Sequence, residues 1–226
     1  MTSARPTLSR SVEDYLKAIY QLGDRAESVS TNEIAERLSV AAASVTAMVK
    51  RLAESGHVEH EPYRGVRLTN EGKRAALAVI RRHRILETYL ITKLGYDWAG
   101  VHDEAERLEH AVSDELVERM AFALGNPMYD PHGAPIPTRD GKIERPSLVP
   151  LSALDVNQAA TLRQVGDDDS ERLRYLKSIG LTPMVPLSVI DRKPFGGPIT
   201  IRIGAPETRD QVIGPELAEC LFVEPS

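Results

Sequence analysis

The spacing of hydrophobic residues predicts three helices and a hairpin at the start of the chain. Apolar residues recur every three or four positions in segments 11–21, 33–38 and 42–54, which is the period of one face of a helix. Segment 57–69 instead alternates apolar and polar residues around a Pro-Gly turn, as in a two-stranded hairpin. Three helices followed by a hairpin predict a winged helix-turn-helix.

The hydrophobic residues in the middle of the chain have a helical period as far as about residue 124 and no regular period after that. A long helix is predicted over 70–94 and another over roughly 103–124, and each is followed by a glycine that can end it. Between 125 and 148 the chain is rich in proline and has no regular period, which predicts an irregular linker.

The last part changes to a strand period. A short helix is predicted before Gly180, and alternating apolar residues predict strands around 185–189, 199–203 and 220–225. The fold class is therefore mainly α with a small β domain: an N-terminal winged helix-turn-helix, a helical middle domain and a C-terminal SH3-like β-barrel. The predicted domain boundaries are 1–73, 74–148 and 149–226.

Composition and charge indicate the cellular compartment and the part of the chain that could contact nucleic acid. The net charge is −5 over 226 residues, which alone argues against a nucleic-acid binder. Residues 1–100, however, carry 15 Lys and Arg against 12 Asp and Glu, whereas residues 101–226 carry 13 against 21. Any DNA contact is therefore expected in the first half. Cys220 is the only cysteine, and no stretch is apolar enough to span a membrane, so a cytoplasmic protein is predicted.

Histidines and acids fall on one stripe of the second long helix. On a helix, positions i, i+4, i+7 and i+8 share a face, and these positions are His102, Glu106, Glu109 and His110. Apolar neighbours indicate that the stripe faces protein, where unpaired charges are costly. These residues could therefore hold a metal ion.

A second pair supports the same interpretation. His83 and Glu87 lie at i and i+4 on the first long helix. Any one such pair can be explained by surface salt bridges with nearby arginines. The whole set on two helices favours a metal site. The sequence contains neither a Glu-x-x-His pair on these histidines, nor His-Glu-x-x-His, nor a glycine-rich phosphate loop, so an enzyme is the weaker interpretation.

Six segments resemble one known family. "EDYLKAIY", "ASVTAMVKRLAESG", "YRGVRLTNEGK", "RRHRILE", "VHDEAERLEH" and "PHGAPIP" resemble the diphtheria toxin repressor family of metal-dependent transcriptional regulators. The resemblance is nearly continuous over residues 11–137 and weaker beyond. It implies a homodimer with winged-helix DNA heads, a helical dimerisation domain and an SH3-like (FeoA-like) third domain.

The resemblance also implies two metal ions per subunit. Acidic residues of the third domain would complete the second site, although helix capping explains the same acidic run without a metal. His57, His60 and His132 are expected not to be ligands. The implied primary site is Asp14, Glu106, Glu109 and His110, and the implied second site is His83, Glu87, His102, Asp168 and Glu171.

Two departures from the iron-regulating branch bear on the choice of metal. That branch has methionine at the position of Asp14 and cysteine at the position of Glu106, whereas the manganese-regulating branch has acids at both. Hard carboxylates suit Mn²⁺ better than soft sulfur ligands do. Mn²⁺ is therefore expected, with Fe²⁺ as the alternative. The shorter manganese regulators have a glutamate in place of Lys17, so Lys17 cannot copy its role as a ligand.

The helix over 42–54 is expected to read DNA in the major groove, because its small N-terminal residues allow close approach. Basic residues of this helix and the wing would contact phosphates. The candidate DNA-binding residues are Ala42, Ala43, Ser44, Thr46, Lys50, Arg51, Tyr63 and Arg64.

The predicted function is metal-dependent DNA binding by a dimer at a palindromic operator, which would control genes of metal homeostasis. No membrane partner is expected. The two alternatives are a di-metal hydrolytic enzyme and a metal-buffering protein.

Overall fold

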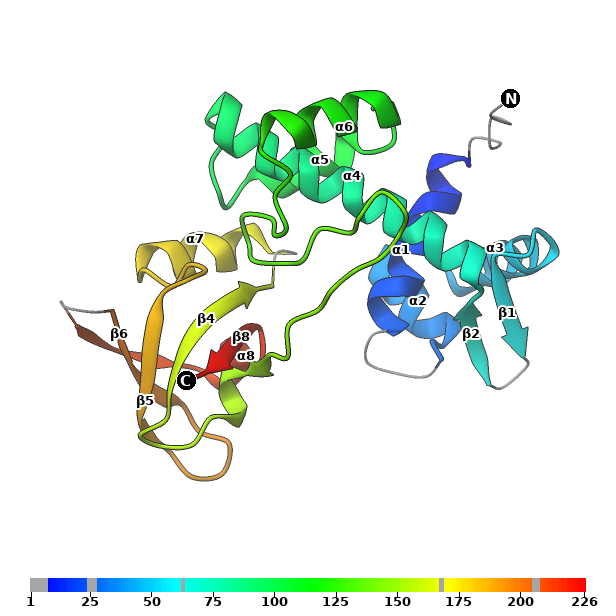
Figure 1. Cartoon of the computed structure of the whole chain (residues 1–226). Coiled ribbons are helices and arrows are strands. Elements are labelled where there is room, and N and C mark those ends of the chain that lie inside the picture. Colours follow the sequence, from blue (N-terminus) through cyan, green and yellow to red (C-terminus); the bar gives the residue numbers. More distant parts are fainter. Residues whose placement is uncertain (1–7, 24–27, 62–63, 167–168, 205–207) are drawn as a thin grey trace. The chain divides into compact units, whose positions relative to one another are not determined.

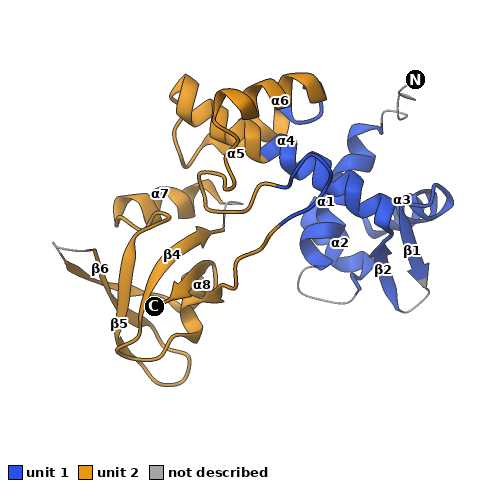
Figure 2. Ribbon diagram, in the orientation of Figure 1, with its two compact units in different colours: residues 1–83, 108–112, 137–143 blue, residues 84–107, 113–136, 144–226 orange. Residues whose placement is uncertain are grey.

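The chain divides into two units. The structure is a computed structural model that describes residues 8–23, 28–61, 64–166, 169–204 and 208–226. Unit 1 comprises residues 1–83, 108–112 and 137–143, and unit 2 comprises residues 84–107, 113–136 and 144–226 (Figure 2).

Unit 1 begins with the predicted winged helix-turn-helix. Ser30 caps the second helix by accepting a hydrogen bond from the Glu33 N–H, and the Glu33 carboxylate accepts one from the Ser30 N–H. This reciprocal arrangement satisfies two amides that a helix start leaves unpaired. Ser39 adopts a left-handed conformation, with φ of 52°, and ends that helix. The elements are α1 (Arg10–Gly23), α2 (Thr31–Leu38), α3 (Ala42–Glu54), β1 (Val58–Glu61) and β2 (Gly65–Leu68) (Figure 1).

One hydrophobic core holds these elements together. Leu16 of α1, Ile34 of α2 and Leu52 of α3 are each fully buried in it. The hairpin is fastened to the same core through a bridge between Val29 and Val66. Because α1 shares this core with α3, a force that positions α1 also positions α3.

The helical region differs from its prediction in one place. Helix α4 (Asn70–Leu94) has the predicted bounds and contributes residues to both units. The single helix predicted over 103–124 is wrong, because the structure contains α5 (Val101–Leu108) and α6 (Asp114–Ala123). The Leu108 carbonyl accepts hydrogen bonds from the Ala111 and Val112 N–H groups, which form a turn. Ser113 then caps α6 by accepting from the Leu116 N–H.

The break between α5 and α6 changes the position of two candidate ligands. Glu109 and His110 lie in the turn between the helices and not on a continuous helical stripe with His102 and Glu106. The turn 108–112 belongs to unit 1, whereas the helices on either side belong largely to unit 2 (Figure 2). The prediction that all four residues share one face of a single helix is therefore wrong beyond Leu108.

The third domain is an antiparallel sheet with its own hydrophobic core. Its strands are ordered β3-β8-β4-β5-β6-β7. Buried residues from every part of the domain, such as Leu162, Leu173, Ile201 and Val223, form the core. The elements are β3 (Val149–Pro150), a 3-10 turn (Leu151–Ala153), β4 (Ala159–Val165), α7 (Ser170–Ser178), β5 (Pro186–Arg192), β6 (Ile199–Ile203), β7 (Arg209–Ile213), α8 (Pro215–Glu219) and β8 (Leu221–Pro225).

The mainly α fold with a C-terminal β domain is thus confirmed. Residues 125–148, all of which are described, form no helix or strand, as predicted. Among the described residues, no helix is both long and apolar enough to cross a membrane.

Candidate metal centre and DNA-reading face

Three predicted ligands converge in unit 1. Helix α1 presents Asp14, and the turn after α5 presents Glu109 and His110. His110 Nε2 lies 2.8 Å from Asp14 Oδ1 and 3.3 Å from Glu109 Oε1. One ligand atom from each residue lies within 4.8 Å of the others. Glu109 is fully buried, and the Asp14 side chain is 32% exposed, so the cluster is open to solvent on the Asp14 side.

The donor set fits a hard divalent ion. Two carboxylate oxygens and one imidazole nitrogen are ligands that Mn²⁺ and Fe²⁺ accept. His110 Nδ1 donates to Glu13 Oε2 at 2.6 Å. Because the carboxylate can only accept this bond, Nδ1 carries a proton, and Nε2 is the ring nitrogen that faces Asp14 and Glu109 and could bind a metal ion. Arg82 also donates to Glu13 and fixes its carboxylate.

Glu13 is a functional candidate that sequence reasoning missed. It immediately precedes Asp14 on α1, and on a helix adjacent residues point about 100° apart. Periodicity therefore places Glu13 off the ligand face. Its role depends on His110, which is 97 positions away, and only the fold shows that pairing.

Lys17 lies beside the same cluster. Its ammonium donates to Glu109 Oε1 at 3.0 Å and to Oε2 at 2.9 Å, and it is 7% exposed. His83 Nδ1 lies 2.6 Å from Glu109 Oε2. Glu109 therefore contacts two other buried polar side chains besides facing His110.

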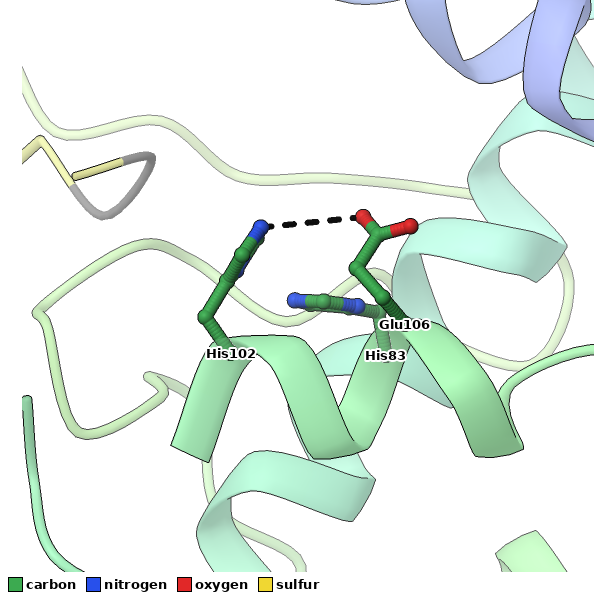
Figure 3. A group of neighbouring side chains, drawn as sticks. All are labelled: His83, His102 and Glu106. Carbon is green, nitrogen blue, oxygen red and sulfur yellow. Dashed lines mark ion pairs between the residues drawn. The ribbon is translucent and has the colours of Figure 1, made fainter. Parts of the chain in front are cut away.

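A separate set of predicted ligands lies in unit 2. His102 Nδ1 lies 3.2 Å from Glu87 Oε1, and His102 Nε2 lies 3.7 Å from Glu106 Oε1, one turn along α5. Figure 3 shows His102 and Glu106 facing each other, and it also labels His83 on α4. Glu106, expected beside Asp14, thus forms an ion pair with His102.

Glu87 has a second histidine neighbour. His132 Nδ1 lies 3.8 Å from Glu87 Oε2, and both side chains are fully buried. His132 Nε2 bonds to the Trp98 carbonyl at 3.0 Å. His132 lies in the "PHGAPIP" segment, which is distant from Glu87 in the sequence, so only the fold shows this pairing.

The acidic run before α7 shows a capping role. Asp169 caps α7 by accepting from the Glu171 and Arg172 N–H groups at 2.9 and 3.0 Å. The bond from the Arg172 backbone N–H is the main cause that lowers the pKa of the Asp169 carboxyl, and the Glu171 N–H lowers it further. Glu171 is exposed in the first turn of the helix. Asp168 lies outside the described residues.

One face of α3 is exposed to solvent and carries most of the candidate DNA-binding residues. Val45, Val49 and Leu52 are buried, and the opposite face is solvent-exposed. Ser44 does not cap the helix, because Ala41 is at the N-cap and no side chain caps there. The exposed residues of α3 include the candidates Ala42, Ala43, Ser44, Thr46, Lys50 and Arg51.

The remaining two DNA candidates are in the wing. Arg64 is exposed in the turn that leads into β2. Tyr63 lies outside the described residues. The Thr46 hydroxyl donates to the Ala42 carbonyl at 3.0 Å, which leaves its methyl group as the surface it can offer to a base.

Comparison with known families assigns each region of the chain. Residues 7–66 match the iron dependent repressor N-terminal DNA binding domain, and residues 69–138 match the iron dependent repressor metal binding and dimerisation domain. Residues 149–225 match the FeoA domain.

Individual relatives agree with these matches. The iron-dependent repressor IdeR of Mycobacterium leprae is 31% identical over 226 residues, which cover 95% of this chain and 96% of that protein. The diphtheria toxin repressor of Corynebacterium diphtheriae is 37% identical over 58% of each chain. A manganese-dependent transcriptional repressor solved in complex with manganese is 41% identical, with a TM-score of 0.90 over 95% of this chain and all of that one.

These relatives are repressors, which excludes the hydrolytic enzyme and the metal buffer as alternatives. The ligand cluster and the winged helix-turn-helix are the two features that a metal-responsive regulator requires. The chain therefore belongs to the diphtheria toxin repressor family of metal-dependent, DNA-binding transcriptional regulators.

Proposed function

We propose that the protein is a repressor activated by Mn²⁺, with Fe²⁺ as the second candidate effector. The observation that carries the proposal is the convergence of Asp14, Glu109 and His110 on one point in unit 1. Two of these ligands are carboxylates and none is a sulfur atom. Because Mn²⁺ binds weakly in the Irving–Williams order, a hard oxygen-rich set is the kind that retains it.

The cluster can control DNA binding because it joins α1 to the turn after α5. Asp14 and Glu109 both direct carboxylate oxygens toward His110. A divalent ion bound among these atoms would attract both carboxylates. Asp14 then holds α1 to the turn, and the core shared by α1 and α3 passes that restraint to the DNA-reading helix. Metal binding thus favours one arrangement of the head.

A second ion per subunit is proposed at His83, Glu87 and His102. His83 Nδ1 contacts Glu109, so Nε2 is the ring nitrogen that would bind this ion. The contact between His102 and Glu87, both in unit 2, supports these two residues as ligands of one ion. Asp168 and Glu171 remain the proposed ligands from the third domain, although Glu171 is exposed.

The protein would act as a homodimer on double-stranded DNA in the cytoplasm. The match of residues 69–138 to a dimerisation domain supports two heads per assembly. A twofold dimer requires a roughly palindromic operator, with half-sites about one helical turn, or a multiple of it, apart. Small residues at the start of α3 would approach the bases, while Lys50 and Arg64 would contact phosphates.

A mobility-shift titration tests the proposal. Chelator-treated protein is mixed with DNA from its own promoter, and Mn²⁺, Fe²⁺ or Zn²⁺ is added under anaerobic conditions. Mn²⁺ is expected to produce a specific shift at the lowest concentration. Asp14→Asn should remove the Mn²⁺ response, whereas the matched variant Asp210→Asn, at an exposed ion pair of the third domain, should keep it. Equal DNA binding with and without metal would contradict the proposal.

A further inference from the structure

The ammonium group of Lys17 lies among atoms that could themselves bind a cation. Lys17 Nζ is 2.9 and 3.0 Å from the two Glu109 oxygens and 3.4 Å from His83 Nδ1. Lys17 is on α1, three residues after Asp14, so both side chains project from the same face of that helix. The cationic group of Lys17 thus lies between a carboxylate and an imidazole, which is the environment of a bound metal ion.

Burial makes this contact energetically important. Glu109 is 0% exposed and Lys17 is 7% exposed. A buried carboxylate is strongly unfavourable unless a cation and hydrogen bonds compensate its charge. Lys17 supplies both for Glu109 without any metal. The pair therefore explains how the turn 108–112 can bury a carboxylate in the metal-free protein.

The same contact limits what a metal ion meets. Glu109 Oε1 is shared between the Lys17 ammonium and the side of the cluster that faces His110. Glu109 Oε2 is shared between Lys17 and His83. An ion at Asp14, Glu109 and His110 would therefore share Glu109 with the positive charge of Lys17. An ion between Glu109 and His83 would overlap with the Lys17 ammonium group.

We propose that Lys17 is an internal cation that sets the ion count and the affinity of this centre. Its ammonium occupies the position between Glu109 and His83 that a second divalent ion would take, so that Asp14, Glu109 and His110 hold a single exchangeable ion. By sharing Glu109, it also weakens binding of that ion and raises the metal concentration at which the protein responds. This inference rests on the proposed function, because it assumes that the cluster binds metal.

Three substitutions at this position separate charge from packing. Lys17→Met keeps a long side chain and removes the charge, Lys17→Arg keeps the charge, and Lys17→Glu replaces the cation with a further carboxylate. Each full-length protein is stripped with chelator and dialysed against MnCl₂. Bound manganese is counted by elemental analysis, affinity is measured by competition with a fluorescent chelator, and thermal unfolding is recorded with and without Mn²⁺. Electron paramagnetic resonance detects coupling between neighbouring Mn²⁺ ions.

The metal-free Lys17→Met protein is expected to unfold several degrees below wild type, because Glu109 loses its cation. It should bind the ion at the Asp14 cluster about tenfold more tightly, since the competing charge is gone. Lys17→Glu should bind one more Mn²⁺ per chain than wild type and show coupled spectra. Lys17→Arg, which keeps the positive charge, should bind the same number of Mn²⁺ ions per chain as wild type.

An unchanged manganese count in Lys17→Glu, with unchanged affinity in Lys17→Met, would overturn the inference. If wild type still bound Mn²⁺ and responded to it on DNA, the proposed function would stand and only the role of Lys17 would fall. If neither wild type nor Lys17→Met bound Mn²⁺, the proposed function would fall as well.

Discussion

Glu13→Gln should weaken metal activation although Glu13 is not itself a proposed ligand. The Glu13 carboxylate accepts from His110 Nδ1 at 2.6 Å and also from Arg82. An amide at this position keeps the shape and one acceptor oxygen but loses the negative charge. The His110 ring would then be held less firmly with its Nε2 toward Asp14 and Glu109.

The expected magnitude follows from this geometry. Removing a group that hydrogen-bonds to a metal-ligating histidine typically weakens metal affinity about 10- to 100-fold, which corresponds to about 1.4 to 2.7 kcal/mol. The upper part of this range is expected here, because the Glu13 and His110 side chains are only 14% and 8% exposed and solvent screens their contact weakly.

Fluorescence anisotropy of labelled operator DNA measures the effect. Stripped protein is titrated with MnCl₂, and the midpoint of DNA binding is compared between variants. The control is Glu224→Gln, at an exposed glutamate of the third domain that pairs with Arg163. Glu13→Gln should shift the midpoint to higher Mn²⁺ while full saturation is still reached. A midpoint equal to that of Glu224→Gln would refute the positioning role of Glu13.

Three further predictions concern DNA contact, helix capping and the ranking of the metal sites. Neutralising Lys50 and Arg64 together should weaken binding to all sequences and lower the slope of log affinity against log salt by about two; an unchanged slope would show that neither contacts phosphate. Asp169→Ala should cost about 0.5 to 2 kcal/mol of unfolding free energy by denaturant titration at pH 7. The folded pKa of Asp169 is lowered below its ordinary 3.8. The stabilisation from its charge is therefore complete above pH 3.8 and is lost as the pH falls through the folded pKa. A loss of unfolding free energy in Asp169→Ala that does not shrink at acidic pH would contradict the charged cap. Asp14→Ala should reduce Mn²⁺-activated operator binding more than Asp168→Ala combined with Glu171→Ala, because Asp14 joins the first site to α1; equal losses in the same anisotropy assay would contradict this ranking of the sites.

Periodicity predicted α3, the helix that is proposed to read DNA. Helix α4 has the predicted bounds because its apolar stripe, its start and its terminal glycine all agree. Strand β4 was not predicted, because a bulge between Leu162 and Gln164 shifts its register and breaks the alternation of buried residues. Strand β7 is at the edge of its sheet and is mostly polar, so it lacks an apolar pattern.

The metal centre was only partly predictable, because it depends on where a helix ends and on contacts between residues distant in sequence. The helical spacing of acids and histidines predicted Glu109 and His110 as ligands, but it placed them on a helix that ends at Leu108 in the structure. Capping by Ser113 competes with continuation of that helix, and the turn between them aims both side chains toward α1. Contacts of Glu13 with His110 and of Lys17 with Glu109 each join residues more than 90 positions apart, and no local pattern specifies such pairs.

The central claim is that a metal ion held by Asp14, Glu109 and His110 favours the DNA-binding state. Metal and DNA must then strengthen each other by the same factor. The direct test is to measure Mn²⁺ affinity of the wild-type protein by chelator competition, with and without saturating operator DNA. Operator DNA is expected to tighten Mn²⁺ binding by the factor by which Mn²⁺ tightens operator binding, and a non-specific duplex should do so much less. Mn²⁺ affinity that is the same with operator, with non-specific DNA and without DNA would contradict the claim.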